Sequence, residues 1–363
     1  LEHLTPHQVA GTTQMELSDI NSLVLEALNA GIIIGPRPGI IRESASGSAP
    51  EPRQMGRESE WVNTLARFEK SRVFALQWHI TQACDLHCRH CYDRTPAAPL
   101  PLDQEIKVLD SLTDFCDTHH LFGQVTFTGG NPLLHPHFLR LYQEAADRGF
   151  FLGILGNPAP PEMIDKICAV QTPSFFQVSL EGLEPHNDYI RGSGHFQRIL
   201  TFLQLLKKAG IYSKVMLTLT RANAGQVLAL GERLRNRTDQ FTFNRLSLQG
   251  EGASLTMADI KHYDSFLESY AIAAKNNPTL GLKDNLFNVL HLKTKAPLFG
   301  GCTGFGCGAA FNFVSLLPTG EIHACRKFPS YLGNITQSSL TEIYHSKTAQ
   351  KYRRGPEECI SCD

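Results

Sequence analysis

The chain has 363 residues, of which 42% are hydrophobic, and a formal net charge of −1. This length allows two domains, or one large domain with extensions, and enough apolar residues for a sizeable core. Without a basic excess the chain is not expected to bind nucleic acid, and no apolar run approaches the ~20 residues of a membrane span. The ten cysteines fall in clusters with short, metal-type spacings, which favours a reducing cytoplasm over a disulfide-stabilised secreted protein.

Residues 1–71 are predicted to form an N-terminal extension that ends in a linker. One amphipathic stretch, 17–28, has the apolar spacing of a helix. Short apolar runs within 30–41 are interrupted by Gly and Pro and could form a hairpin or a docking arm. Residues 43–54 are rich in Ser, Gly, Pro and Glu, a composition typical of flexible linkers.

Residues 72–255 alternate short apolar segments with amphipathic segments of helical length. This alternation predicts a parallel sheet with helices outside it, and six such units would form an open, partial barrel. Ligands of such architectures bind at the carboxyl ends of the strands. The predicted strands are 73–80, 124–128, 151–156, 175–181, 213–219 and 241–248. The predicted helices are 103–118, 136–148, 160–169, 196–209 and 224–236, followed by a helical stretch within 256–285.

The loop after the first predicted strand carries Cys84, Cys88 and Cys91 with the spacing C-x3-C-x2-C. Three thiolates without a nearby fourth could hold an iron–sulfur cluster and leave one iron open to a small molecule. Two alternatives are three core cysteines on one helix face and a zinc site completed by His87 and His90. The polar residues between the cysteines argue against the helix. The spacing departs from the paired C-x2-C arrangement usual for zinc.

Polar residues also follow the later strands, where a ligand is expected. Gly129, Gly130 and Asn131 follow the second strand, and glycines there permit a ligand to approach the backbone closely, although an ordinary turn would look the same. Ser179 and Glu181 share one face of the fourth strand. Three further residues are candidates for ligand binding. The alternative for the arginine is a surface salt bridge, and the alternative for the threonine is that it simply favours a strand. These further candidates are Arg191, Thr218 and Asn223.

From residue 286 the composition changes, and a region rich in Gly and Cys follows. Two short apolar segments, 311–317 and 322–325, flank a Pro-Thr-Gly turn and predict a hairpin. Cys116 and Cys168 lie within predicted helices and are interpreted as small buried hydrophobes. The remaining cysteines have short spacings that suit a cluster or zinc. They are Cys302, Cys307, Cys325, Cys359 and Cys362.

The first cysteine triad resembles the signature of radical S-adenosylmethionine (SAM) enzymes. The C-terminal region resembles the SPASM/twitch extension of radical SAM peptide maturases, through Cys307, Gly320 and Cys325 (C-x12-G-x4-C) and the final Cys359-x2-Cys362. The resemblance implies an α/β fold, with a partial (β/α)6 barrel of the radical SAM type and a C-terminal Cys-rich α+β auxiliary-cluster domain. The domains expected on this basis are 1–71, 72–285 and 286–363.

The resemblance also implies roles for single residues. Cys84, Cys88 and Cys91 would hold a [4Fe–4S] cluster whose free iron binds the amino and carboxylate groups of SAM. Asn131 stands where the family motif G-G-E-P-L has the Glu that holds this amino group. Its amide oxygen can still accept a hydrogen bond from an ammonium but brings no charge of its own to that bond. Ser179 and Glu181 are expected at the ribose, and Arg191 at the carboxylate of the cofactor. The full set of expected cofactor-binding residues is Tyr92, Thr128, Gly129, Gly130, Asn131, Ser179, Glu181, Arg191, Thr218 and Asn223.

The C-terminal cysteines would hold one or two auxiliary [4Fe–4S] clusters, with zinc as the alternative. Cys302, Cys307 and Cys325 would supply three ligands of the first cluster. Cys359 and Cys362 would begin a second set, or one of them would close the first. The chain stops at Asp363, so the expected second set is incomplete within it.

In this family the cluster cleaves SAM to a 5′-deoxyadenosyl radical, which removes a hydrogen from an unactivated carbon. We therefore expect an enzyme that modifies a ribosomally made peptide, with a thioether or another Cys-centred change suiting an auxiliary cluster. The expected partners are a precursor peptide or protein substrate and an electron donor such as flavodoxin or ferredoxin. One alternative is an enzyme that oxidises a protein Cys or Ser side chain, of the sulfatase-maturing type. The other is a non-enzymatic zinc- or cluster-binding interaction protein. The sequence nominates no catalytic acid or base.

Overall fold

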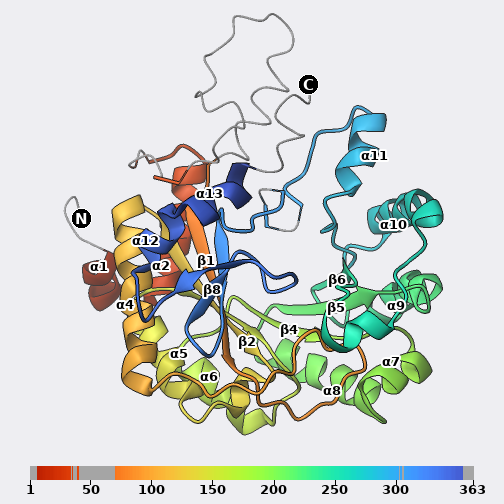
Figure 1. The fold of residues 1–363 in the computed structure, drawn as a ribbon, viewed down its shortest axis with the longest axis horizontal. Helices are drawn as coiled ribbons and strands as arrows, with labels where there is room; N and C mark the ends of the chain where they lie inside the picture. The colour runs from red at the N-terminus through yellow and green to blue at the C-terminus, as the bar shows by residue number, and fades with distance from the viewer. Residues whose placement is uncertain are drawn as a thin grey trace, which may run out of the picture.

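A computed structural model describes residues 6–33, 35, 39–40, 70–301, 303–304 and 306–354. Within these residues the centre of the molecule is a nine-stranded sheet with the order β6-β5-β4-β3-β2-β1-β7-β8-β9 (Figure 1). The predicted linker at 43–54 lies outside the described residues, as do Cys302, Cys359 and Cys362.

The first six strands form the parallel sheet that the alternating pattern predicted. All neighbouring pairs from β1 to β6 run parallel. Side chains on both faces of β1 are buried, as expected for a strand covered by helices on one side and a packed interior on the other. The strands are β1 (Val73–Thr81), β2 (Phe122–Gly129), β3 (Phe151–Leu155), β4 (Phe175–Ser179), β5 (Ser213–Leu219) and β6 (Gln240–Arg245).

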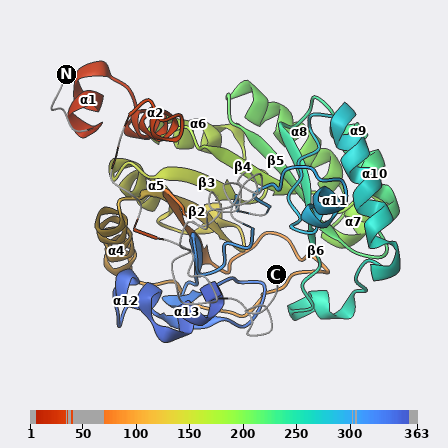
Figure 2. The same cartoon turned by 90° about the horizontal axis from the view of Figure 1, so that it is seen from above.

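Helices cover the outer side of this curved sheet (Figure 2). Most of them bury an apolar stripe; in α8, Ile199, Leu203 and Leu206 are fully buried. The five predicted barrel helices are present, and α7 is an additional one. They are α4 (Leu102–His119), α5 (Phe138–Asp147), α6 (Pro161–Val170), α7 (Glu184–Arg191), α8 (His195–Lys208) and α9 (Val227–Leu234). The fold class is thus confirmed as a partial barrel of the predicted kind.

The remaining helices lie around the barrel. The N-terminal helix α2 includes the predicted stretch 17–28 and is tied to the barrel by Asn21, whose Nδ2 donates to the Gly149 carbonyl at 3.0 Å. No helix in the described part of the chain is both long and apolar enough to span a bilayer. These helices are α1 (Pro6–Thr13), α2 (Leu17–Asn29), α10 (Tyr263–Asn276) and α11 (Phe287–Lys293). Short 3-10 turns occur at Pro132–Leu134 (η1), Ala224–Gln226, Gly250–Ser254 and Ile260–His262.

The C-terminal region extends the barrel sheet on the side of β1 that faces away from β2. Strand β7 (Phe313–Leu316) pairs in parallel with β1, and β8 (Glu321–His323) and β9 (Tyr331–Asn334) follow in antiparallel order. This confirms the predicted hairpin. Gly320 in its turn has φ of 83°, and a Cβ there would press against Asn334, so the turn requires glycine. The predicted boundary at residue 286 stays a prediction.

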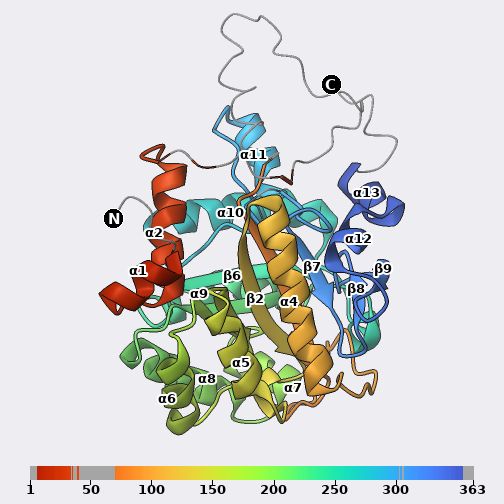
Figure 3. The same ribbon diagram turned by 90° about the vertical axis from the view of Figure 1, so that its left-hand side faces the viewer.

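Two C-terminal helices, α12 (Leu340–His345) and α13 (Lys347–Arg354), complete the described chain (Figure 3). Helix α12 lies against α4, where His345 Nε2 is 3.2 Å from His119 Nε2. The rings of Phe74, Phe115 and Tyr344 pack together with centroids 4.6–5.7 Å apart. Because β1, α4 and α12 each contribute one of these rings, the barrel and the C-terminal region share one apolar core.

Candidate functional site

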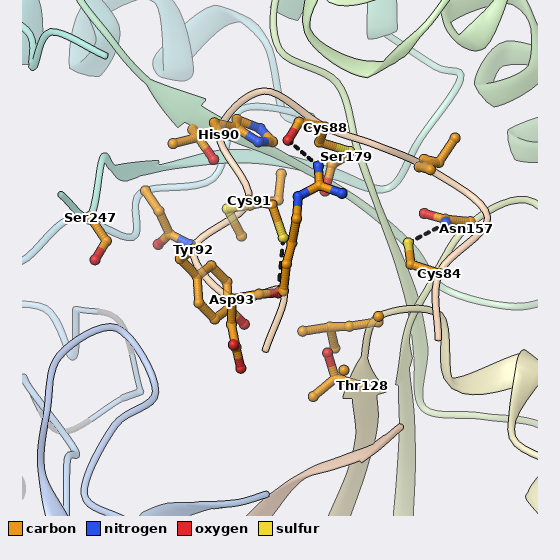
Figure 4. A pocket seen from close by; sticks show the side chains of 18 of the residues that line it. Cys84, Cys88, His90, Cys91, Tyr92, Asp93, Thr128, Asn157, Ser179 and Ser247 are labelled. Carbon is orange, nitrogen blue, oxygen red and sulfur yellow. Dashed lines mark hydrogen bonds between the residues drawn. The ribbon is translucent and has the colours of Figure 1, made fainter. Parts of the chain in front are cut away.

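A cavity of about 480 Å³ opens at the carboxyl ends of the parallel strands. Its wall is built largely by the cysteine loop, residues 82–94, which follows β1 (Figure 4). The ends of β2 to β6 supply further lining residues, and Lys327 reaches the cavity from the C-terminal region. This is the position at which parallel α/β folds bind their ligands.

Cys84, Cys88 and Cys91 all line this cavity. They lie in an irregular loop and not in a helix, so the alternative of three core cysteines on one helix face is wrong. Asn157 Nδ2 is 3.7 Å from Cys84 Sγ, and Arg191 Nη1 is 3.6 Å from Cys88 Sγ. Burial raises the pKa of the Cys88 thiol, and the charge of Arg191 opposes that rise. Donors aimed at two of the sulfurs favour their thiolate forms, which are the forms that bind iron.

Several observations show that these residues fit an iron–sulfur cluster. The three sulfurs face a cavity with room for a group much larger than one ion. His87 and His90, the histidines of the zinc alternative, lie 2.6 Å from Arg94 Nη1 and 2.9 Å from Glu181 Oε1. The site therefore suits a multi-iron cluster held by three thiolates better than a zinc ion.

Seven of the ten predicted cofactor-binding residues line the same cavity. Gly129 and Gly130 pass directly beside the cysteine loop, because Gly130 N donates to the Thr81 carbonyl and Asn131 N to the Ala83 carbonyl, at 2.8 and 2.7 Å. A Cβ on either glycine would clash with one of these carbonyl oxygens, so glycine is required at both positions. The seven residues are Tyr92, Thr128, Gly129, Gly130, Ser179, Arg191 and Thr218.

The other three candidates, Asn131, Glu181 and Asn223, are buried behind the wall. Glu181 accepts from Arg191 Nη2 at 2.6 Å, lies 2.9 Å from His90 Nε2, and accepts from the backbone N of Thr218 at 2.8 Å. Burial alone would raise the pKa of this carboxyl, but His90 and Arg191 hold it well below its usual range. Glu181 therefore fixes Arg191 and the cysteine loop, and its contact with a ribose stays a prediction.

Asn131 and Asn157 both point at Asp85 in the cysteine loop. Their Nδ2 atoms donate to the same oxygen, Asp85 Oδ1, at 3.0 and 2.7 Å. Asn131 Oδ1 accepts from the backbone N of Leu133 at 3.3 Å and so caps η1. Asn223, by contrast, donates from Nδ2 to the carbonyls of Glu181 and Thr218 and so supports the strand ends.

The C-terminal region contacts the cysteine loop through Arg326, which follows Cys325. Its guanidinium pairs with Asp93 of the cysteine loop, and Gln82 Nε2 donates to the same carboxylate at 2.6 Å. Cys325 is partly buried and Cys307 is exposed. The other three predicted auxiliary ligands lie outside the described residues, so the auxiliary site stays a prediction. Cys116 is buried as expected, whereas Cys168 is only partly so.

Four residues around the cysteine loop were not among the predicted site residues: Asp85, Asp93, Asn157 and Arg326. The available signal was position: Asp85 and Asp93 flank the cysteines, and Asn157 directly follows the third strand. Charged and amide residues at such places are candidates in any parallel α/β fold.

Two family models match this chain. A model described as the radical SAM superfamily matches residues 78–230, and one described as an iron–sulfur cluster-binding domain, SPASM, matches residues 307–363.

Among curated proteins, the chain is similar to the AdoMet-dependent heme synthase of Methanosarcina barkeri, with 23% identity over 310 residues covering 78% of this chain and 85% of that protein. It is also similar to the mycofactocin maturase MftC of Mycobacterium tuberculosis, with 26% identity over 267 residues, or 72% of this chain and 67% of that one.

Solved structures share the fold. Streptococcus suis SuiB bound to its precursor peptide SuiA aligns with a TM-score of 0.65 at 13% identity, over 95% of this chain and 83% of that one. The structure of anSMEcpe with bound AdoMet aligns with a TM-score of 0.60 at 16% identity, over 80% of this chain and 86% of that one.

Proposed function

The chain is a radical SAM enzyme with a C-terminal SPASM domain, and we propose that it modifies a ribosomally made peptide by hydrogen abstraction. Membership of an enzyme superfamily removes the alternative of a non-enzymatic binding protein. One observation carries the proposal: the cysteine loop and Lys327 of the C-terminal region line the same cavity, and the ion pair of Asp93 and Arg326 joins the two regions beside it. A peptide held there would lie within reach of both cysteine-bearing regions.

The cofactors of this enzyme are a [4Fe–4S] cluster with SAM and the auxiliary iron–sulfur cluster of the SPASM domain. When bound, the first cluster and SAM supply a 5′-deoxyadenosyl radical, which can remove hydrogen from an unactivated carbon. Cys84, Cys88 and Cys91 would hold that cluster. Arg191, oriented by Glu181, would hold the carboxylate of the cofactor.

The other lining residues shape the cavity around the cofactor. Gly129 and Gly130 leave the β2 end without side chains, so a ligand can lie against the backbone. Thr128, Ser179 and Thr218 offer hydroxyl groups from three different strands. Walls from the barrel on one side and the C-terminal region on the other would exclude water from a reactive intermediate.

We further propose that the product is a thioether or another Cys-centred change, because an auxiliary cluster suits a thiol substrate. Forming a thioether from a Cys thiol and a C–H bond removes two hydrogens from the peptide. One leaves as a hydrogen atom, taken by the 5′-deoxyadenosyl radical, and the other leaves as a proton to solvent and an electron that the auxiliary cluster would accept. Similarity to MftC, a mycofactocin maturase, and to SuiB, solved with its precursor peptide, supports a peptide substrate.

Oxidation of a protein Cys or Ser side chain is less well supported. Such a reaction needs a side chain beside the substrate to accept its proton, whereas the thiol of a thioether-forming substrate would lose its proton to solvent on binding the auxiliary cluster. Of the carboxylates in the described part of the chain, Asp93 alone lines the cavity, and it is already paired with Arg326 and bonded by Gln82. A peptide maturase is therefore the function that the site supports best, working in a reducing cytoplasm with flavodoxin or ferredoxin as donor.

The test is anaerobic reconstitution of the full chain, followed by reaction with dithionite, SAM and short Cys-containing peptides encoded beside its gene. We expect 5′-deoxyadenosine and a peptide that is lighter by a pair of hydrogen atoms, seen by mass spectrometry. A Cys168→Ala chain is the matched control, because this cysteine lies in α6, away from the cavity. Deoxyadenosine without any altered peptide would refute the peptide proposal, and a sulfatase-derived peptide converted instead would favour the alternative.

A further inference from the structure

The methionine end of SAM carries both an ammonium and a carboxylate group. A charged group that leaves water for a protein cavity needs an opposite charge or several hydrogen bonds. Arg191 can serve the carboxylate, but the strand end that resembles G-G-E-P-L offers Asn131 in place of a Glu. If the site pairs the ammonium with an opposite charge, that charge belongs to another residue of this chain.

Asn131 is not oriented to accept that group. Its Oδ1 caps η1 by accepting from Leu133 N, and its Nδ2 is turned to Asp85. An ammonium approaching Asn131 would meet either a neutral oxygen that already accepts one hydrogen bond or a second donor, and neither offers a negative charge. The side chain is 4% exposed, so its orientation is fixed by burial as well.

The carboxylates around the cysteine loop differ in how their charges are balanced. Among the described residues, Glu181 is paired with Arg191 and His90, and Asp93 with Arg326. Glu251 is about half exposed and lies 3.9 Å from Arg94. Asp85 differs from all three, because its described partners, Asn131 and Asn157, are neutral. Neutral donors orient a carboxylate without cancelling its charge.

The geometry leaves Asp85 able to bind a cation. Both amides donate to Oδ1, and within the described chain no partner is found on Oδ2. The two amides come from the ends of β2 and β3 and are buried, whereas Asp85 itself is exposed. Asn157 lines the cavity and also contacts Cys84 Sγ. The carboxylate is thus held at a fixed place beside the first cysteine of the triad, at the edge of the cavity and not among its lining residues.

We propose that Asp85 supplies the carboxylate that receives the ammonium group of SAM, and that Asn131 and Asn157 are positioning residues for it. The inference rests on the proposed radical SAM function and adds a binding residue to the same site. In the G-G-E-P-L motif the negative charge follows the second strand. In this chain the corresponding charge is that of Asp85 in the cysteine loop. Asn131 keeps a part in cofactor binding, but as a donor to Asp85.

The test measures binding by equilibrium dialysis to the reconstituted full chain and to Asp85→Asn. Two ligands are used: SAM, and its analogue with a hydroxyl in place of the α-amino group. The amide oxygen that this substitution introduces can still accept from both asparagines, so the loop is preserved. We expect the substitution to weaken SAM binding about tenfold or more, the loss of one charge-assisted bond. Binding of the hydroxy analogue should stay nearly the same in both chains.

Equal weakening of both ligands would mean that Asp85 only supports the loop, and no weakening of either would mean that it has no part in binding. Each result overturns the inference. Glu251→Gln, which removes another carboxylate near the loop, is the matched control and should change neither ligand. If Asp85→Asn does not fold, Asp85→Ser replaces it, and we expect the same selective weakening of SAM binding.

Failure of the inference and failure of the function are separable. SAM binding needs no peptide, so a wild-type chain that binds SAM and shows no role for Asp85 refutes only the inference. A wild-type chain that fails to bind SAM refutes the function itself.

Discussion

The two cysteine-bearing regions of this enzyme meet at one cavity but are held in place differently. The cysteine loop, residues 82–94, has little regular structure, and buried side chains hold it: Glu181 with His90 and Arg191, and Asp85 with its two asparagines. The C-terminal hairpin, β7 to β9, is held by backbone pairing to β1 and by a glycine turn. Among the described residues, the ion pair of Arg326 and Asp93 links the hairpin to the cysteine loop.

This difference indicates that the two regions tolerate amino-acid substitutions to different degrees. A loop held by charges and amides depends on single side chains, because each buried polar group must keep its partner. A strand added to an existing sheet depends on many backbone bonds, and no single side chain carries them. We therefore expect substitutions around the cysteine loop to have larger effects than comparable ones in the hairpin.

The largest contrast is expected between Cys88→Ala and Cys325→Ala. The first should reduce 5′-deoxyadenosine formation to background, because the cluster beside SAM loses one of three ligands. The second should leave the rate of SAM cleavage within about tenfold of the wild-type rate, which is ~1.4 kcal/mol in activation free energy. Peptide modification should be lost. Anaerobic assays of deoxyadenosine and of iron, with loss of about four irons per cluster, check both outcomes. Equal loss of cleavage in the two variants would remove the distinction between the regions.

The next largest effect is expected for Glu181→Gln. Removing this charge leaves Arg191 and His90 without their buried partner, and breaking a buried ion pair typically costs about 3–5 kcal/mol. The free energy of unfolding from urea denaturation measures it. Lys293→Gln, which breaks the exposed pair of Lys293 and Asp264, should cost about 1 kcal/mol or less. Similar losses in both variants would show that the Glu181 network adds little to the loop.

The sequence was sufficient for the barrel strands and five of its helices, because their apolar spacing is local. It missed α7, since Glu184–Arg191 is mostly polar and offers only Asn187 and Ile190 to the interior. It also missed the anchoring of Asp85, because the two amides lie 46 and 72 residues further along the chain. Pairing over such distances depends on the closed fold, which no local pattern contains. The same holds for β7, whose partner β1 precedes it by more than 200 residues.

A pH-dependent effect is expected behind the cysteine loop, at His195. The backbone N of Glu181 donates to Asn187 Oδ1, so Asn187 Nδ2 faces His195 Nδ1 at 3.1 Å and requires a neutral ring that accepts there. Burial, followed by the charges of Arg191 and Arg198, lowers the pKa of His195 to about 4.

The sign of this effect follows from the two pKa values. Below pH 6.5, the ordinary pKa of histidine, His195 binds a proton in the unfolded chain but stays neutral in the folded chain. The free energy of unfolding therefore falls as the pH drops from 6.5 towards 4. The loss should reach about 3 kcal/mol. Urea denaturation at pH 7 and near pH 4 should show a smaller loss for His195→Gln than for the wild type. Parallel losses would assign the effect to other groups.

The smallest effect is expected in the C-terminal region, for Ser339→Ala at the start of α12. Ser339 Oγ accepts from Glu342 N at 3.2 Å, and Glu342 Oε2 accepts from Ser339 N at 2.8 Å, a reciprocal capping box. Losing an N-cap of this kind costs about 1 kcal/mol. Because backbone pairing holds the hairpin, the loss should appear in urea denaturation and leave deoxyadenosine formation unchanged. A large fall in SAM cleavage by this variant would show that the hairpin and the cysteine loop are more tightly coupled than their different construction implies.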